Sequence, residues 1–189
     1  MKKKIDKKNT KKNKKCSTAL YIGKFQPFHK GHLQIVKNIL QKYDKVKIAI
    51  GSAQKHHQQK NPFTKEERKK MIVAALDDAG ISRKKYKLFY VPDIPNDNAY
   101  PTHVQKIVGL FEKIFTGYWL NIKLFRNAGF KVHAIKRLYN ISATQIRKSI
   151  ANNTKTYQKM TPSAVIQIIN YIDGKKRIKE IKKYGQGGI

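Results

Sequence analysis

The sequence predicts an α/β protein: a Rossmann-like parallel sheet with helices on both faces and further helices at the C-terminal end. Two observations predict this class. Short apolar runs alternate with segments of helical periodicity along most of the chain. The first run, residues 18–22, has the character of a parallel strand covered on both faces, and a turn leads from it to apolar residues at helical spacing, namely Leu33, Val36, Ile39 and Leu40.

The later elements follow from the same patterns. Apolar runs predict strands at 46–50, 86–91, 113–115 and 131–135, and helical periodicity predicts helices at 64–76, 104–110, 119–125 and 162–183. Thr64 and Glu67 have the spacing of a capping box, which marks the start of the first of these helices. Pro92 ends the third strand, and a loop rich in Asp and Asn follows it. These patterns indicate neither an internal repeat nor a second domain.

Size and composition are those expected of one domain. The chain of 189 residues is long enough for one substantial core, so we assign residues 18–189 to a single domain and residues 1–17 to a basic N-terminal tail. No apolar run approaches the roughly 20 residues that cross a bilayer, and no apolar stretch follows the N-terminal lysines as in an export signal. Cys16 is the single cysteine, which excludes an intrachain disulfide. We expect a cytoplasmic protein without a membrane partner.

The chain is strongly basic, with 42 Lys and Arg against 11 Asp and Glu and a formal net charge of +31. Such a charge attracts nucleoside phosphates, nucleic acids and acidic surfaces alike. Residues 1–15 hold nine lysines, one aspartate and almost no apolar side chain, so we expect the tail to be disordered. Two interpretations of the tail stay open: a solvated leader without function, or weak binding of nucleic acid or another polyanion.

The turn after the first predicted strand, residues 23–32 (GKFQPFHKGH), carries the groups of a phosphate-binding site. It opens a helix, and a helix N-terminus offers unpaired N–H groups and a partial positive charge to an anion. Gly31 lets a phosphate approach the backbone. His29 and His32 lie on one side of the first helical turn, and Lys24 adds a compact cation. Histidines at this spacing also occur as metal pairs or polar cap residues, although no third ligand stands nearby in the sequence.

A second loop that enters a helix stands at residues 141–147 (ISATQIR). Ser142 or Thr144 can cap this helix, and Arg147, one turn further on, can present its planar guanidinium to phosphate oxygens. Alone, the pattern is typical of a helix cap with a solvated arginine. Because both motifs follow strands of one parallel sheet, we expect a triphosphate to lie between the first helix and Arg147.

Together, the two motifs resemble those of the nucleotidyltransferase superfamily of adenylyl- and cytidylyltransferases. The resemblance narrows to the archaeal-type nicotinamide-nucleotide adenylyltransferases, because residues 51–55 (GSAQK) and 61–68 (NPFTKEER) are similar to a stretch of those proteins. Residues 92–100 (PDIPNDNAY) are similar to their nicotinamide-binding loop. The similarity runs from about residue 20 to about residue 172, in compatible order and spacing.

The resemblance implies the nucleotidyltransferase fold and adenylyl transfer from ATP to nicotinamide mononucleotide (NMN), which gives NAD and pyrophosphate. The acceptor phosphate then attacks the α-phosphorus in line, so the protein positions the reactants and stabilises charge. Lys24, His29 and His32 match positions that bind the ATP phosphates and the transition state, and Arg147 matches the position that holds the departing phosphates. The other implied ATP-binding residues are Ile22, Gly23, Phe25, Gly31, Ile141, Ser142 and Thr144.

On the acceptor side, the resemblance implies NMN contacts from Gln54, Asp93, Asn96 and Tyr100. Tyr100 stands where the family usually has tryptophan, and it keeps an aromatic face for stacking on the nicotinamide ring. A second departure is Thr116-Gly117-Tyr118, where the family usually has Ser-Gly-Asn; it leaves the ATP-side contact at this position open. The Asp- and Asn-rich loop is also typical of a plain surface turn.

The resemblance further implies Mg²⁺ that bridges the ATP phosphates and keeps most of its waters, so we expect no metal-ligating residue. The implied partners are ATP, NMN and further copies of the chain in a homo-oligomer. Three alternatives stay open. The acceptor is instead pantetheine phosphate, FMN, glycerol phosphate or nicotinate mononucleotide; or the chain is a non-enzymatic nucleic-acid-binding module, which would explain the charge but not the ordered pair of phosphate motifs; or it is a fragment of a class I aminoacyl-tRNA synthetase, although it lacks a Lys-Met-Ser-Lys-Ser run.

Overall fold

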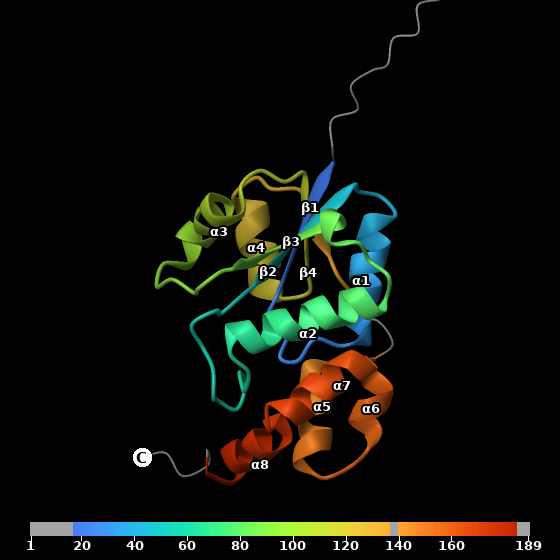
Figure 1. Ribbon diagram of the computed structural model, residues 1–189. Helices are drawn as coiled ribbons and strands as arrows, with labels where there is room; N and C mark the ends of the chain where they lie inside the picture. Colours follow the sequence, from blue (N-terminus) through green and yellow to red (C-terminus); the bar gives the residue numbers. More distant parts are fainter. Residues whose placement is uncertain (1–16, 137–139, 185–189) are drawn as a thin grey trace, which may run out of the picture.

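A computed structural model of the protein describes residues 17–136 and 140–184 (Figure 1). Its centre is a five-stranded parallel sheet in the order β3-β2-β1-β4-β5. The strands are β1 (Thr18–Gly23), β2 (Lys45–Ile50), β3 (Tyr86–Tyr90), β4 (Lys113–Thr116) and β5 (Val132–Ala134). Successive strands from β1 to β3 lie progressively closer to one edge of the sheet, and β4 and β5 lie on the other side of β1. The direction of winding therefore reverses between β1 and β4, and such a reversal opens a crevice at the carboxyl ends of the strands.

Helices cover both faces of the sheet, as predicted. Helices α1 (Lys30–Leu40) and α2 (Lys65–Asp78) lie on one face, and α3 (Tyr100–Val108) and α4 (Trp119–Asn127) lie on the other. Alternate residues of β1 serve the two layers: Ala19 and Tyr21 are buried with the first pair of helices, and Leu20 and Ile22 with the second pair. This double burial explains why β1 is apolar along nearly its whole length.

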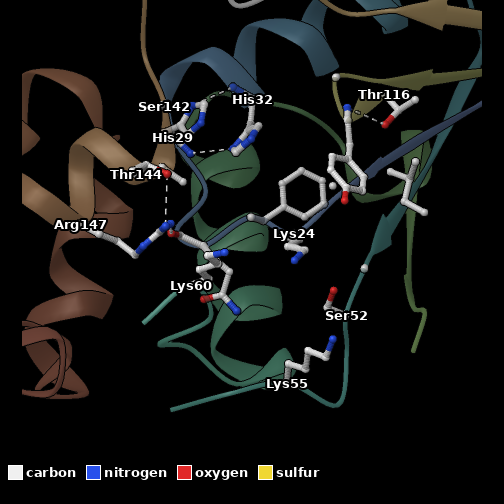
Figure 2. A pocket seen from close by; sticks show the side chains of 18 of the residues that line it. Lys24, His29, His32, Ser52, Lys55, Lys60, Thr116, Ser142, Thr144 and Arg147 are labelled. Carbon is white, nitrogen blue, oxygen red and sulfur yellow. Dashed lines mark hydrogen bonds between the residues drawn. The ribbon is translucent and has the colours of Figure 1, made fainter. Parts of the chain in front are cut away.

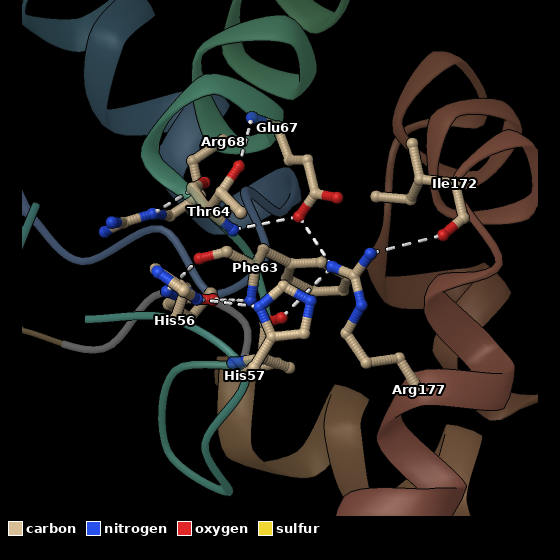
Figure 3. A network of polar contacts seen from close by, with 10 residues as sticks. His56, His57, Phe63, Thr64, Glu67, Arg68, Ile172 and Arg177 are labelled. Atoms are coloured by element: carbon tan, nitrogen blue, oxygen red, sulfur yellow. Dashed lines mark hydrogen bonds and ion pairs between the residues drawn. The ribbon is translucent and has the colours of Figure 1, made fainter. Parts of the chain in front are cut away.

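In the described part of the chain after β5, four helices follow: α5 (Ala143–Ala151), α6 (Thr156–Met160), α7 (Ser163–Tyr171) and α8 (Gly174–Tyr184). They gather on the α2 side of the molecule, with α7 packed along α2 (Figure 1). A polar network joins α8 to α2, because Arg177 Nη1 donates to Glu67 Oε2 at 2.7 Å and to the carbonyl of Pro62 at 3.2 Å (Figure 3). Glu67 also accepts the N–H of Thr64, which confirms the predicted capping box.

Within the described ranges, no helix has the length and apolar character that a bilayer crossing requires.

The structure differs from the prediction mainly at helix ends. The single helix predicted at 162–183 is two helices, because Asp173 adopts a left-handed φ of 52° and the chain turns there. Gly174 is required after it: a Cβ at this position would lie 2.9 Å from the Phe63 ring and 3.0 Å from the carbonyl of Ile169. Helix α3 ends before Gly109, whose φ is 70°, and so excludes Leu110.

Three short elements were not predicted, namely α6 and the 3₁₀ turns η1 (Arg83–Lys85) and η2 (Asp97–Ala99). At the N-terminus, residues 1–16 of the predicted tail lie outside the described residues. Ser17 is already part of the fold, because its N–H and hydroxyl donate to Asp44 at 2.8 and 3.0 Å.

The loops after β1 and β2 are joined by one buried side chain, that of Arg68 on α2. Arg68 is 0% exposed, and its guanidinium donates to the carbonyls of Lys24 at 3.0 Å and Gly51 at 2.8 Å. Further donations reach Ser52, Ala53 and the helix's own Thr64. All five hydrogen bonds end on backbone carbonyls. Burial lowers the pKa of Arg68 to about 10, so the side chain stays charged at neutral pH.

We expect Arg68→Met to lower the free energy of unfolding by about 3 kcal/mol or more, because methionine fills the space of the stem but leaves buried carbonyls without a donor. Urea titration followed by circular dichroism measures the change. Lys69→Met is the matched control, since Lys69 is the exposed neighbour on the same helix. Equal stabilities of the two variants would contradict the role given to Arg68.

Candidate active site

A cavity of about 1410 Å³ opens where the strands end, at the point where the winding reverses. All four residues predicted to be catalytic line it, as do all seven further residues predicted to bind ATP. Asp93 and Tyr100 also line the cavity, whereas Gln54 and Asn96 are not among the lining residues. The two sequence motifs therefore meet in one site, as expected for loops at the carboxyl edge of a parallel sheet.

His29 and His32 stack at the start of α1, with ring centroids 3.5 Å apart (Figure 2). Each ring accepts the backbone N–H of the other residue at its Nδ1 atom, at 3.2 and 3.3 Å. The pair thus forms the N-terminal cap of α1, and the cap role considered for these histidines is real. Because both Nδ1 atoms act as acceptors, the proton of each neutral ring lies on Nε2, where it can be donated to a ligand.

Both imidazoles are neutral at physiological pH. Burial lowers the pKa of His29 to about 4. Burial also lowers the pKa of His32 well below its ordinary value, and the neighbouring His29 adds to this effect. The pair therefore offers hydrogen-bond donors to an anion without bringing a positive charge of its own.

Arg147 connects the two motifs, because its Nη1 donates to the carbonyl of Gln26 at 2.9 Å and its Nη2 to Thr144 Oγ1 at 3.2 Å (Figure 2). Its pKa is lowered by burial. Ser142 caps α5 by accepting the N–H of Gln145 at 3.2 Å, so the helix that carries Arg147 has a fixed start. The guanidinium is thereby held over the loop that carries Lys24 and the two histidines.

The opposite wall of the cavity follows β2 and β3. The carboxylate of Asp93 accepts the hydroxyl of Ser52 at 3.0 Å and pairs with Lys55 Nζ at 2.9 Å. Gln54 uses its side-chain amide on the backbone of Asp93, donating to the carbonyl at 3.1 Å and accepting the N–H at 3.0 Å. Asn96 accepts the N–H of Asn98 and so caps η2. Gln54 and Asn96 shape this loop in the ligand-free chain, and as NMN contacts they stay predictions.

Tyr100 lies at the first position of α3 and is 9% exposed. Its ring packs edge-on against Phe125, with centroids 6.4 Å apart, and burial raises the pKa of its hydroxyl. A side chain at Gly23 would be crowded, because its Cβ would lie 2.9 Å from the ring of Phe25.

The sequence did not single out several polar residues that line the cavity. Half of them are lysines, and in a chain with so many lysines nothing distinguishes these from solvated ones. The residues are Ser52, Lys55, Gln59, Lys60, Asp97, Asn121, Lys136, Lys148, Asn152 and Lys182. Cationic side chains thus outnumber carboxylates around the cavity, which suits a polyphosphate ligand.

The comparisons with known proteins agree with this site. The cytidylyltransferase-like family model matches residues 20–149. The chain is 41% identical to the nicotinamide-nucleotide adenylyltransferase of Thermococcus sibiricus over 163 residues, which are 85% of this chain and 87% of the relative. It is 40% identical to the Archaeoglobus fulgidus protein of the same name over 170 residues, which are 86% of this chain and 96% of the relative.

A solved structure is similar in fold: a bifunctional NMN adenylyltransferase/ADP ribose pyrophosphatase from Francisella tularensis, complexed with AMP and a manganese ion. The TM-score is 0.71 at 24% identity, and the match covers 91% of this chain but 53% of that one, so this chain spans about half of the bifunctional protein. The nucleotidyltransferase fold is confirmed. On the family match and the curated relatives, the chain belongs to the cytidylyltransferase-like family and, within it, to the archaeal-type nicotinamide-nucleotide adenylyltransferases.

Proposed function

We propose that this protein transfers the adenylyl group of ATP to NMN, forming NAD and releasing pyrophosphate. The observation that carries the proposal is the convergence of Lys24, the histidine pair and Arg147 on one cavity, in a chain about 40% identical to proteins named for this activity. The non-enzymatic alternative is less well supported, because a nucleic-acid-binding surface needs no such enclosed set of phosphate ligands.

In this reaction a phosphate oxygen of NMN attacks the α-phosphorus of ATP. A new P–O bond forms while the bond from the α-phosphorus to the bridging oxygen breaks, and that oxygen leaves with pyrophosphate. The substrate phosphate is itself the nucleophile, so no nucleophilic side chain is needed. The Nε2–H groups of His29 and His32 donate to phosphate oxygens, Lys24 adds a positive charge, and Arg147 neutralises the departing pyrophosphate.

The divalent cation of this reaction fits the site as a companion of ATP. Within the described ranges, no three His, Cys, Asp or Glu side chains gather as a metal site. The cavity instead presents cationic groups and N–H donors, which bind phosphate oxygens. We therefore propose Mg²⁺ held by the triphosphate and water, where it supplies charge neutralisation; Asp93 and Asp97 are the carboxylates that line the cavity.

An acceptor panel tests the proposal. Purified protein is given ATP with NMN, nicotinate mononucleotide, pantetheine phosphate, FMN or glycerol phosphate, and pyrophosphate release is measured. We expect the highest kcat/KM with NMN. A higher value with pantetheine phosphate, FMN or glycerol phosphate would overturn the proposed acceptor and leave the ATP site intact.

Removing the charge-stabilising groups should slow turnover. His32→Ala and Arg147→Ala are each expected to lower kcat by roughly 10²-fold or more, the scale found when one preorganised stabiliser of transition-state charge is lost. Steady-state kinetics at saturating ATP and NMN measure this. Lys30→Ala is the control, since Lys30 is exposed on the same helical turn and does not line the cavity. Near-normal turnover in both site variants would disprove the assignment.

The neutral state of the histidines can be checked in the ligand-free protein. The ring resonances of His29 should remain those of a neutral imidazole until the pH falls to about 4. An unfolded histidine takes up its proton near pH 6.5, so the unfolded chain binds more protons between these values, and the folded state should lose stability as the pH falls through this window. Nuclear magnetic resonance of 15N-labelled protein measures the titration. A midpoint near 6.5 would show that the ring is not desolvated as described.

Three further expectations stay proposals. They are the homo-oligomer, the cytoplasmic location, and weak polyanion binding by the N-terminal tail, whose residues 1–16 lie outside the described residues.

A further inference from the structure

Two aromatic rings stand exposed at the start of α4, next to the cavity. Tyr118 is 52% exposed and Trp119 is 66% exposed, and their ring centroids lie 6.2 Å apart. Single exposed apolar side chains are common on protein surfaces, but an exposed aromatic ring in the lining of a cavity is typical of a binding site. Among the described residues, Leu110 and Tyr171 are the other large apolar side chains with comparable exposure, and of the four, Tyr118 alone lines the cavity.

The turn that carries Tyr118 is hydrogen-bonded to the last residue of β4. The Tyr118 backbone N–H donates to Oγ1 of Thr116 at 3.3 Å, and Thr116 is completely buried (Figure 2). The carbonyl of Thr116 accepts the N–H of Ile135, directly after β5, at 2.9 Å. The backbone before Tyr118 is therefore anchored to the sheet, and the Tyr118 side chain lines the cavity.

The sheet order places this ring on the donor side of the cavity. Asp93 and Tyr100 follow β3 on one side of β1, whereas Tyr118 follows β4 on the other side. The residues proposed to bind phosphate lie on the loop after β1, on α1 and on α5. The lining on the β4 and β5 side includes the apolar residues Ile135 and Ile141 and the polar residues Asn121 and Lys136. With NMN assigned to the β3 side, this side is left for the nucleoside of ATP, and the ring of Tyr118 is the aromatic surface there.

We propose that Tyr118 forms the stacking face for the adenine ring of ATP and thereby favours adenine over pyrimidine nucleotides at the donor site. The inference rests on the proposed function in one respect, that ATP is the donor. Stacking of a base on an aromatic side chain contributes about 1–3 kcal/mol, so its loss corresponds to a rise in Kd of roughly fivefold to 150-fold. A larger purine surface gains more from this contact than a pyrimidine.

Trp119 can report binding by its fluorescence, because it is the single tryptophan of the chain and its ring lies beside that of Tyr118. ATP, CTP, inorganic tripolyphosphate and NMN are titrated separately into the protein, with binding measured by calorimetry and Trp119 emission recorded in parallel. Tyr118→Ala should weaken ATP binding about tenfold and reduce the ATP-to-CTP preference. Tripolyphosphate and NMN should bind as before, since neither carries a base that reaches this ring.

Two variants control the result. Tyr118→Phe keeps the ring and should keep the affinity for ATP within about twofold. Tyr171→Ala removes a ring that is 86% exposed at the end of α7, away from the cavity, and should change nothing. An unchanged Kd for ATP in Tyr118→Ala would overturn the proposal, as would an equal loss for tripolyphosphate or a loss for NMN alone. If instead the acceptor panel shows that NMN is not the substrate, the ATP titrations still test the contact with Tyr118. Failure of the proposed acceptor and failure of the Tyr118 proposal are therefore distinguishable.

Discussion

The hydrogen bonds of one buried guanidinium position the two loops that carry most of the residues proposed to bind phosphate. Arg68 reaches from α2 beneath the loops after β1 and β2 and donates to carbonyls of both. A charge without contact to water is stable only when its donors are satisfied, and here the partners are backbone groups that themselves need donors. The same hydrogen bonds therefore satisfy both the buried guanidinium and the backbone carbonyl groups. The loop that carries Lys24 and the loop that carries Ser52 and Lys55 are therefore held at a fixed separation.

The uncharged hydrogen-bond donors and the positive charges of this site lie on different side chains. His29 is buried and His32 is partly buried; both rings are neutral and each caps the other residue, so they can approach phosphate oxygens without repelling nearby cations. The positive charge is left to Arg147 and Lys24, whose pKa values burial also lowers. Partial desolvation strengthens the attraction of these two groups for an anion, and a bound polyphosphate restores the solvation they lack. The free site is thus less favourable for its cations than the occupied one, which suits a site that binds and releases a polyanion.

The sequence was most informative where chemistry is local. The turn that opens α1, the caps by Ser142 and by Thr64 with Glu67, and the apolar strands all depend on neighbours within a few positions, and their places in the fold were predicted correctly. Phosphate binding by the turn stays a prediction. Arg68 could not be found this way, because arginine in a helix is normally exposed and its partners are backbone carbonyls up to 44 positions away. The close approach of Gly174 to Phe63, directly after the break between the last two helices, is likewise a contact that only the folded chain brings about.

The large net charge has a limited part in the chemistry. At physiological ionic strength exposed charges are screened over about 8 Å, so most of the +31 acts on the arrival of anions and little on the bound state. Part of the local charge is neutralised as well, since Lys55 is paired with Asp93. The proposed phosphate site itself is a small set of fixed groups, among them Arg147, which is hydrogen-bonded to Gln26 and Thr144. On this proposal, selectivity among nucleotides comes from the uncharged ends of the cavity, where Tyr100 and Tyr118 stand on opposite sides of β1.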